Sequence, residues 1–170
     1  MIRFALSAWL WIALATLIGG CSDGSSGPDT VVESTDIEER DPCDLPVDDI
    51  PVSSTESGIE YVRTPDACFD NLDGYPFQPN YVEVEGLRYH YWSYLYRKMI
   101  PVLADAGYRV IAPDHIGMGR SDKPVDPRVH QFEQHVTWLK SFVSSLALTD
   151  ITLFVQDWGS HFGLRMAGDN

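Results

Sequence analysis

The sequence has 170 residues, of which 44% are hydrophobic, and a formal net charge of −13. The charge is unevenly spread, because residues 22–60 hold 12 acidic side chains and one base, Arg40, whereas residues 61–170 hold 13 acidic and 10 basic side chains. The second part therefore has an ordinary surface charge and no basic patch, which argues against a nucleic-acid partner. Since only this part can form a core, we expect one small domain.

The first twenty residues have the pattern of a secretory signal peptide. Arg3 precedes an apolar run from Phe4 to Ile18, and two glycines lead into Cys21. The run of about 15 residues is short for a transmembrane helix, which needs about 20, so a permanent membrane span is the weaker alternative. The sequence IGGC at 18–21 resembles the bacterial lipobox, which implies that Cys21 is lipidated and becomes the mature N-terminus.

A lipidated Cys21 predicts a protein anchored in the cell envelope, with the membrane as one of its partners. Ser22, rather than aspartate, follows Cys21 and favours the outer membrane, with the protein facing the periplasm. In such an oxidising compartment Cys43 and Cys68 can form a disulfide. Whether they pair is left open by the sequence.

Residues 21–60 are rich in Asp, Glu, Ser and Pro and show no sustained apolar period. Such a segment cannot bury enough apolar surface to offset its loss of conformational entropy. We therefore predict three parts: a signal peptide over residues 1–20, an acidic disordered tether over residues 21–60, and a folded domain over residues 61–170.

Helical and strand patterns alternate in the predicted domain. Polar and apolar residues alternate about Gly86 in YVEVEGLRYHY (81–91), which predicts an antiparallel hairpin. A helix is expected over 92–107, kinked or broken by Pro101 and stopped by Gly107. Buried strands are expected over 108–114 and 151–155. A helix between them carries apolar residues on one face, namely Phe132, Val136, Leu139, Val143 and Leu146.

Alternating helices and apolar strands predict an α/β fold with a mostly parallel sheet after the N-terminal antiparallel hairpin. No cysteine or histidine spacing suits a metal, and neither a metal nor another cofactor is expected.

The candidate for chemistry is the sequence Val155-Gln156-Asp157-Trp158-Gly159, a strand end followed by a tight turn into a helix. This outline is typical of a nucleophile elbow, with Asp157 in the central position. A carboxylate there can attack carbon and form an ester. On its own the pattern equally fits an aspartate that only caps a helix.

A wider resemblance favours the catalytic interpretation. The segments WSYLYRKM, APDHIGMGRSDKP and VQDWG, in this order, resemble the haloalkane dehalogenases, and the likeness extends over most of 61–168. It implies a partial α/β-hydrolase fold. It also implies that Asp157 attacks the halogen-bearing carbon of a small halogenated alkane. Trp158 would bind the departing halide ion through its indole N–H and its backbone N–H.

The sequence departs from this family at two places. Tyr91 runs straight into Trp92, where relatives have about twenty more residues with a central strand, so the sheet would contain unpaired backbone groups. The helical cap, the catalytic acid and the general-base histidine of relatives come after the position of Asn170. Without a base the ester would hydrolyse poorly, so we expect an incomplete and inactive hydrolase. Epoxide hydrolase and non-catalytic envelope lipoprotein are the alternative functions.

The histidines of this sequence are weaker candidates. His161 lies on the helix after the elbow, pointing away from the nucleophile, and His115 is expected to pack in a loop. The other three, His90, His130 and His135, lie on predicted strand and helix faces without acidic partners. We expect these three to be surface residues.

Overall fold

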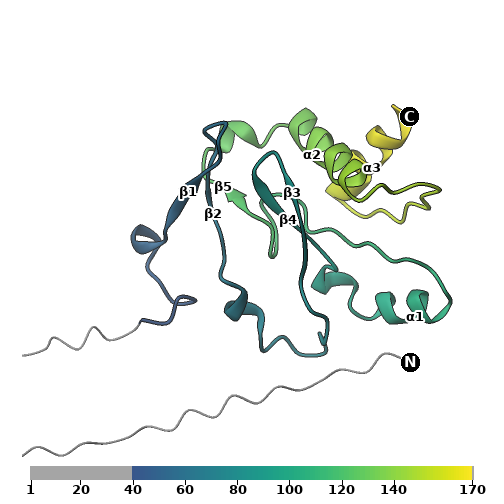
Figure 1. Cartoon of the computed structure of the whole chain (residues 1–170), viewed down its shortest axis with the longest axis horizontal. Helices are drawn as coiled ribbons and strands as arrows, with labels where there is room; N and C mark the ends of the chain where they lie inside the picture. Colours follow the sequence, from purple (N-terminus) through teal and green to yellow (C-terminus); the bar gives the residue numbers. More distant parts are fainter. Residues whose placement is uncertain (1–39, 170) are drawn as a thin grey trace, which may run out of the picture. The chain divides into compact units, whose positions relative to one another are not determined.

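The computed structural model describes residues 40–169 (Figure 1). The predicted signal peptide, Cys21 and the first part of the predicted tether lie outside these residues. Among residues 40–169, none of the helices has both the length and the apolar character needed to cross a bilayer.

An antiparallel hairpin lies at the centre of the described chain. Strand β3 (Asn80–Val84) pairs with β4 (Leu87–Tyr91) over five residue pairs. The two residues of the turn, Glu85 and Gly86, both have positive φ, of 52° and 79°. Such a pair matches the right-handed twist of the flanking strands and closes a two-residue loop. The predicted hairpin about Gly86 is confirmed.

A second, three-stranded sheet includes part of the segment predicted to be a disordered tether. Its order is β1 (Val52–Ser54), β2 (Glu60–Val62) and β5 (Lys123–Pro124), and all its pairings are antiparallel. A single 3-10 turn, η1 (Val47–Asp49), precedes β1. The ordered chain therefore starts before residue 61, because residues 52–54 have ladder partners in residues 60–62.

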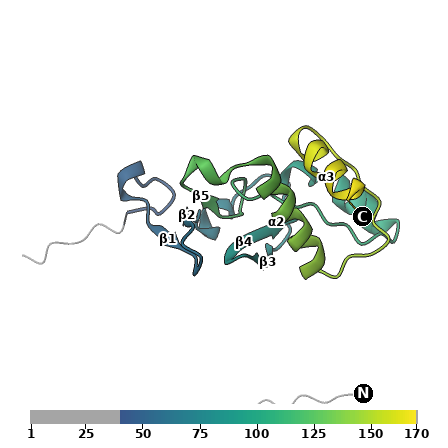
Figure 2. The same ribbon diagram turned by 90° about the horizontal axis from the view of Figure 1, so that it is seen from above.

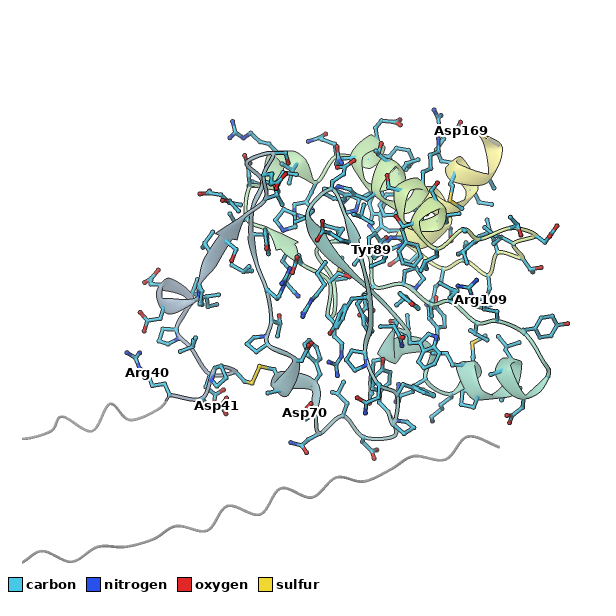
Figure 3. All side chains as sticks on the ribbon, viewed as in Figure 1. Arg40, Asp41, Asp70, Tyr89, Arg109 and Asp169 are labelled. Atoms are coloured by element: carbon cyan, nitrogen blue, oxygen red, sulfur yellow. A yellow bond between two sulfur atoms is a disulfide. The ribbon has the colours of Figure 1, made fainter. Side chains whose placement is uncertain are left out.

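A disulfide also attaches this N-terminal part to the domain. Cys43 and Cys68 are bonded, with Cα atoms 5.4 Å apart, and Cys68 lies in the 3-10 helix η2 (Asp66–Phe69). The bond, drawn in yellow in Figure 3, closes a loop with a sequence separation of 25. Closing such a loop removes conformational entropy from the unfolded chain and stabilises the fold.

The first helical region is shorter than predicted. It consists of the 3-10 turn η3 (Tyr94–Tyr96) and helix α1 (Met99–Asp105). Pro101 lies in the first turn of α1, where its missing N–H has no intrahelical partner to lose, so the helix begins beside the proline rather than kinking at it. The predicted stop is confirmed, since Gly107 follows the helix with a φ of 89°.

Two longer helices cover the hairpin. Helix α2 (Phe132–Ser145) follows the 3-10 turn η4 (Pro127–Val129), and α3 (Trp158–Gly168) lies beside α2 in both views (Figures 1 and 2). The predicted inner face of α2 is largely confirmed, because Val136 and Leu139 are buried. Trp138, Phe142 and Tyr89 of β4 complete the centre of this core, where Figure 3 labels Tyr89.

The two predicted buried strands form no ladder within the described residues. Residues 108–114 make one isolated bridge, Tyr91 to Pro113, and Ala112 O accepts the N–H groups of Trp92 and Ser93. Residues 151–155 have no regular secondary structure, and Phe154 is 68% exposed. The ladders in residues 40–169 are antiparallel, so the parallel part of the predicted sheet does not form there. An extended segment needs a neighbouring strand to satisfy its backbone, and neither segment has one.

Candidate active site

Asp157 lies between segment 151–155 and helix α3 and has a strained backbone conformation. Its φ is 51° and its ψ is −133°, a combination that side-chain-bearing residues rarely adopt. Its carbonyl accepts the N–H of Ser160 at 2.9 Å and so starts the helix. Its side chain makes no capping hydrogen bond. The interpretation of Asp157 as an ordinary N-cap therefore lacks its defining contact, and the conformation is the one expected of a nucleophile elbow.

Small residues allow α3 to pack tightly against the chain that leads into the elbow. A Cβ atom on Gly163 would lie 2.9 Å from Cγ1 of Val155, closer than real contacts allow. Phe162 of the same helix is buried in the core. The elbow is thus fixed from both sides, by Gly163 against Val155 and by Phe162 in the core, while Asp157 itself is exposed.

Trp158, the predicted halide-binding residue, lies directly after Asp157 at the start of α3. Its ring stacks on Phe162, with centroids 5.9 Å apart, and lies 5.4 Å from the ring of His161. The side chain is 60% exposed. Within residues 40–169 no acceptor is bonded to its indole N–H, so this donor is unused at the surface, one residue after Asp157 in the sequence.

His115 packs beneath the start of α3, as expected for a packing residue. Its Nδ1 atom lies 2.7 Å from the hydroxyl of Tyr89, and its ring meets Phe162 edge to face. Its Nε2 atom lies 3.7 Å from the position that a Cβ on Gly159 would occupy. Burial lowers the pKa of His115. A neutral imidazole therefore supports the elbow helix.

His135 of α2 forms a second imidazole contact with α3. Its ring stacks on Phe162 at 5.0 Å and on His130 at 5.5 Å, and its Nε2 lies 3.4 Å from Nδ1 of His130. Burial, His130 and His115 together lower the pKa of His135 to about 4. His135 is therefore not simply a surface residue, because its neutral form is built into the contact between the two helices.

This contact predicts a loss of stability in acid. Because the pKa of His135 is lower in the folded than in the unfolded chain, the unfolded state binds more protons below the ordinary value of 6.5. The stabilisation is complete above about pH 6.5 and is lost as the pH falls toward about 4. Urea unfolding at pH 7.5 and pH 4.5 measures the difference. The His135→Phe variant should show a smaller difference, and an equal difference in the two proteins would contradict the assignment.

Of the histidines, His90 is the one whose predicted surroundings differ most from those in the structure. Predicted to be a surface residue without an acidic partner, it is 1% exposed, and its Nδ1 donates to Oδ2 of Asp114 at 2.8 Å. Alternation in β4 turns Tyr89 toward α2 and His90 toward the opposite face of the hairpin. That face is covered by residues 66–81 and 113–121, which lie elsewhere in the sequence. No local pattern therefore indicates that His90 is buried.

Comparison with known proteins identifies the family of this chain. A family model described as alpha/beta hydrolase fold matches residues 85–170. The chain belongs to the alpha/beta hydrolase family. The predicted fold class is thus confirmed, even though the described residues carry only antiparallel ladders.

Relatives that the chain matches include haloalkane dehalogenases, as the sequence resemblance predicted. One from Mycobacterium marinum is 48% identical over 136 residues, covering 66% of this chain and 46% of the relative. One from Mycolicibacterium paratuberculosis is 46% identical, with 65% and 45% covered. The tetrameric structure of haloalkane dehalogenase DpaA from Paraglaciecola agarilytica NO2 is 43% identical, with a TM-score of 0.61, and the match covers 64% of this chain and 44% of that one. The chain spans less than half the length of these relatives.

The predicted location is corrected by these comparisons. We expected a lipid-anchored protein of the cell envelope, on the outer membrane facing the periplasm. The relatives carry the names of haloalkane dehalogenases and not of envelope lipoproteins, so this prediction is wrong. It rested on a short apolar run and a cysteine. Such a pattern indicates that a segment is hydrophobic and little more. Cys21 and that run lie outside the described residues.

Proposed function

We propose that Asp157 displaces a halide ion from a small halogenated alkane and forms an aspartyl ester. A carboxylate oxygen of Asp157 bonds to the carbon as the carbon–halogen bond breaks, and the bonding pair leaves with the halide. The indole N–H of Trp158, one residue after Asp157, can donate to the departing anion. In a complete reaction, water then cleaves the ester to release an alcohol and restore the carboxylate.

The observation that carries this proposal is the backbone of Asp157. Strained conformations persist where the surrounding structure enforces them, and they gather at functional sites. Here the strain presents a carboxylate that is not used to cap its own helix. The matched relatives, named as haloalkane dehalogenases, supply the substrate class.

We further propose that the 170-residue polypeptide performs the first step much faster than the second. Ester hydrolysis needs a base that activates water. Within residues 40–169 no histidine is hydrogen-bonded to Asp157, and the buried pair His90–Asp114 is part of a different pocket. The ester should therefore accumulate.

Two observations support the proposal that a segment is missing between Tyr91 and Trp92. The match to the Mycobacterium marinum relative spans 136 positions, whereas 66% of 170 residues is about 112, so about 24 positions lack a counterpart in this chain. Trp92 also has a φ of 96°, a value rarely adopted by a bulky residue. A strained junction is expected where the chain bridges two elements that a longer segment would otherwise connect.

The test is a search for the ester. The 170-residue chain, first shown by circular dichroism to melt cooperatively, is incubated with 1-bromobutane and digested for mass spectrometry. We expect a persistent butyl ester on Asp157 that is absent from the Asp157→Asn variant. Asp150→Asn is the matched control, because Asp150 is also an exposed aspartate with positive φ, and this variant should keep the adduct.

Two results would overturn these proposals. An adduct that maps to another residue, and persists in Asp157→Asn, would remove the assignment of the nucleophile. Many equivalents of bromide released for each polypeptide would show that hydrolysis is efficient, and the second proposal would fail while the first stood.

A further inference from the structure

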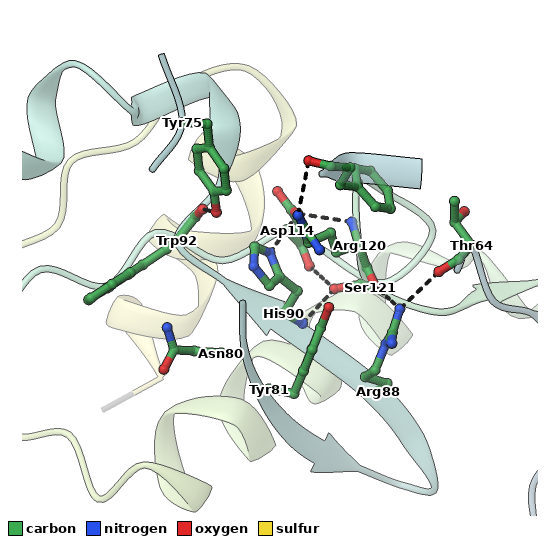
Figure 4. Close-up of polar contacts among 12 residues, drawn as sticks. Thr64, Tyr75, Asn80, Tyr81, Arg88, His90, Trp92, Asp114, Arg120 and Ser121 are labelled. Atoms are coloured by element: carbon green, nitrogen blue, oxygen red, sulfur yellow. Dashed lines mark hydrogen bonds and ion pairs between the residues drawn. The ribbon is translucent and has the colours of Figure 1, made fainter. Parts of the chain in front are cut away.

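Two imidazole rings face each other at the start of α2. Nδ1 of His130 lies 3.4 Å from Nε2 of His135, and the rings are stacked with centroids 5.5 Å apart. The buried ring of His90 differs, because its Nδ1 atom is bonded at 2.8 Å to a carboxylate oxygen of Asp114 (Figure 4). Between His130 and His135, two nitrogens approach each other at the surface. Either a hydrogen or a metal ion can lie between two such atoms.

The distance between these nitrogens favours a metal ion. Hydrogen bonds with an N–H donor usually measure about 2.7–3.2 Å, so 3.4 Å is long for one. Two nitrogens that bind one tetrahedral Zn²⁺ ion at about 2.0–2.1 Å lie about 3.3–3.4 Å from each other. The right angles of a square-planar copper site would bring two nitrogens to within about 3.0 Å. The observed distance therefore fits a tetrahedral zinc ion.

The other ring nitrogen of His130 has the partner that is usual for a histidine that binds a metal. Nε2 of His130 lies 3.0 Å from the carbonyl oxygen of Pro124, which can only accept, so Nε2 carries a hydrogen whatever the charge of the ring. Metal-binding histidines commonly donate their second N–H to such a carbonyl, which fixes the orientation of the ring. Nδ1 is then the nitrogen that can bind an ion.

The ring of His135 is held in place from two sides. It stacks on Phe162 with centroids 5.0 Å apart and meets Trp138 edge to face at 5.1 Å. Within residues 40–169 no protein group is bonded to its Nδ1 atom, so the ring hydrogen can lie there while Nε2 faces His130. Metal binding releases any proton that remains between the two nitrogens. His130 is exposed, and an ion can approach the pair from solvent.

We propose that His130 and His135 form a two-histidine site for Zn²⁺, in which Nδ1 of the first and Nε2 of the second bind the ion. Among residues 40–169 no group of three or more His, Cys, Asp or Glu side chains is placed to hold a metal, so water fills the other two positions on the ion. This proposal departs from the expectation, made from the sequence, that no metal binds. It does not depend on the reaction proposed at Asp157.

Zinc binding is measured on the 170-residue chain without a histidine tag. A Cys21→Ser background removes a thiol that would compete for the ion. Zinc chloride is added at pH 7.5 while the side-chain nitrogen resonances of the histidines are followed by NMR. We expect Nδ1 of His130 and Nε2 of His135 to shift together and saturate at one zinc ion per chain, whereas exposed His161 changes little. Magnesium chloride should produce no shift, because Mg²⁺ prefers oxygen ligands.

Two exposed histidines supply a matched pair of variants. His130→Gln removes one ligand, and its zinc affinity, measured by the shift of Nε2 of His135, should fall by about tenfold or more, since even the loss of a residue that supports a ligand usually costs about 10–100-fold. His161→Gln changes a histidine outside the site and should keep the parental affinity. The proposal is overturned if the parent chain shows no saturating shift at His130 and His135, if His161 shifts equally, or if His130→Gln binds zinc as tightly as the parent.

Discussion

Replacing Asp122 with alanine is expected to lower the free energy of unfolding by about 3 kcal/mol. The Asp122 side chain is fully buried and accepts three hydrogen bonds, from Nε and Nη2 of Arg63 at 2.7 and 2.6 Å and from the backbone N–H of Arg88 at 2.6 Å. Removing it leaves the Arg88 N–H unsatisfied and Arg63 without its counter-ion. Removing one partner of a buried ion pair usually costs about 3–5 kcal/mol. The loss here should be at the lower end of that range, because Arg63 is 42% exposed and can regain water.

A matched control is available in the same region. Asp126 and Arg128 also form a two-pronged ion pair, with contacts of 2.7 to 3.0 Å, but the Arg128 side chain is 88% exposed. Urea unfolding of Asp122→Ala and Asp126→Ala compares the two pairs. Asp126→Ala should have a far smaller effect, since exposed pairs contribute little. Similar losses in the two variants would show that burial is not what makes the Asp122 pair important.

Local patterns in the sequence predicted the features whose causes are local. The turn at Glu85 and Gly86 is closed by adjacent residues with positive φ, and the inner face of α2 follows from helical spacing. The elbow at Asp157 was also predictable, because strand, turn and helix signals follow one another within a few residues. In each case the physical determinant lies inside the segment itself.

The features that were missed or left open depend on distant parts of the chain. The segments 108–114 and 151–155 have the composition of buried strands, yet a strand requires a partner, and composition cannot show whether that partner is present. The bond between Cys43 and Cys68 is likewise decided by how the chain folds back. The pairing of His90 with Asp114 joins two residues that are 24 positions apart.

Unfavourable backbone geometry occurs both at features that local patterns predicted and at features that depend on distant parts of the chain. Among residues 40–169, five non-glycine residues have positive φ, including Trp92 at the junction after β4, Asp150 before the unpaired segment, and Asp157 at the elbow. Glu85 is explained by its hairpin turn. Asp157 differs from the other four because it lies directly before a helix, yet its side chain makes no capping hydrogen bond. Its position at the start of α3 makes it the candidate for function among these residues.

We therefore expect Asp157→Gly to stabilise the fold while it abolishes alkylation. Glycine adopts a φ of 51° with a ψ of −133° without steric cost, whereas a side-chain-bearing residue there stores about 1–3 kcal/mol. Glycine also gives the unfolded chain more freedom, which costs about 0.5–1 kcal/mol. The net gain should be about 1 kcal/mol in urea unfolding.

The same substitution should lower the yield of the ester, and this loss should be much larger than the gain in stability. Glycine has no carboxylate, so the yield of butyl ester should fall by more than about 100-fold. Asp150→Gly provides the control, because Asp150 has a φ of 53°, and its replacement should relieve strain while the adduct on Asp157 persists. If Asp157→Gly were less stable than the parent chain, the strain would not reside at Asp157. If Asp150→Gly also lost the adduct, the two sites would be coupled, and the elbow could not be assigned from the geometry of Asp157 alone.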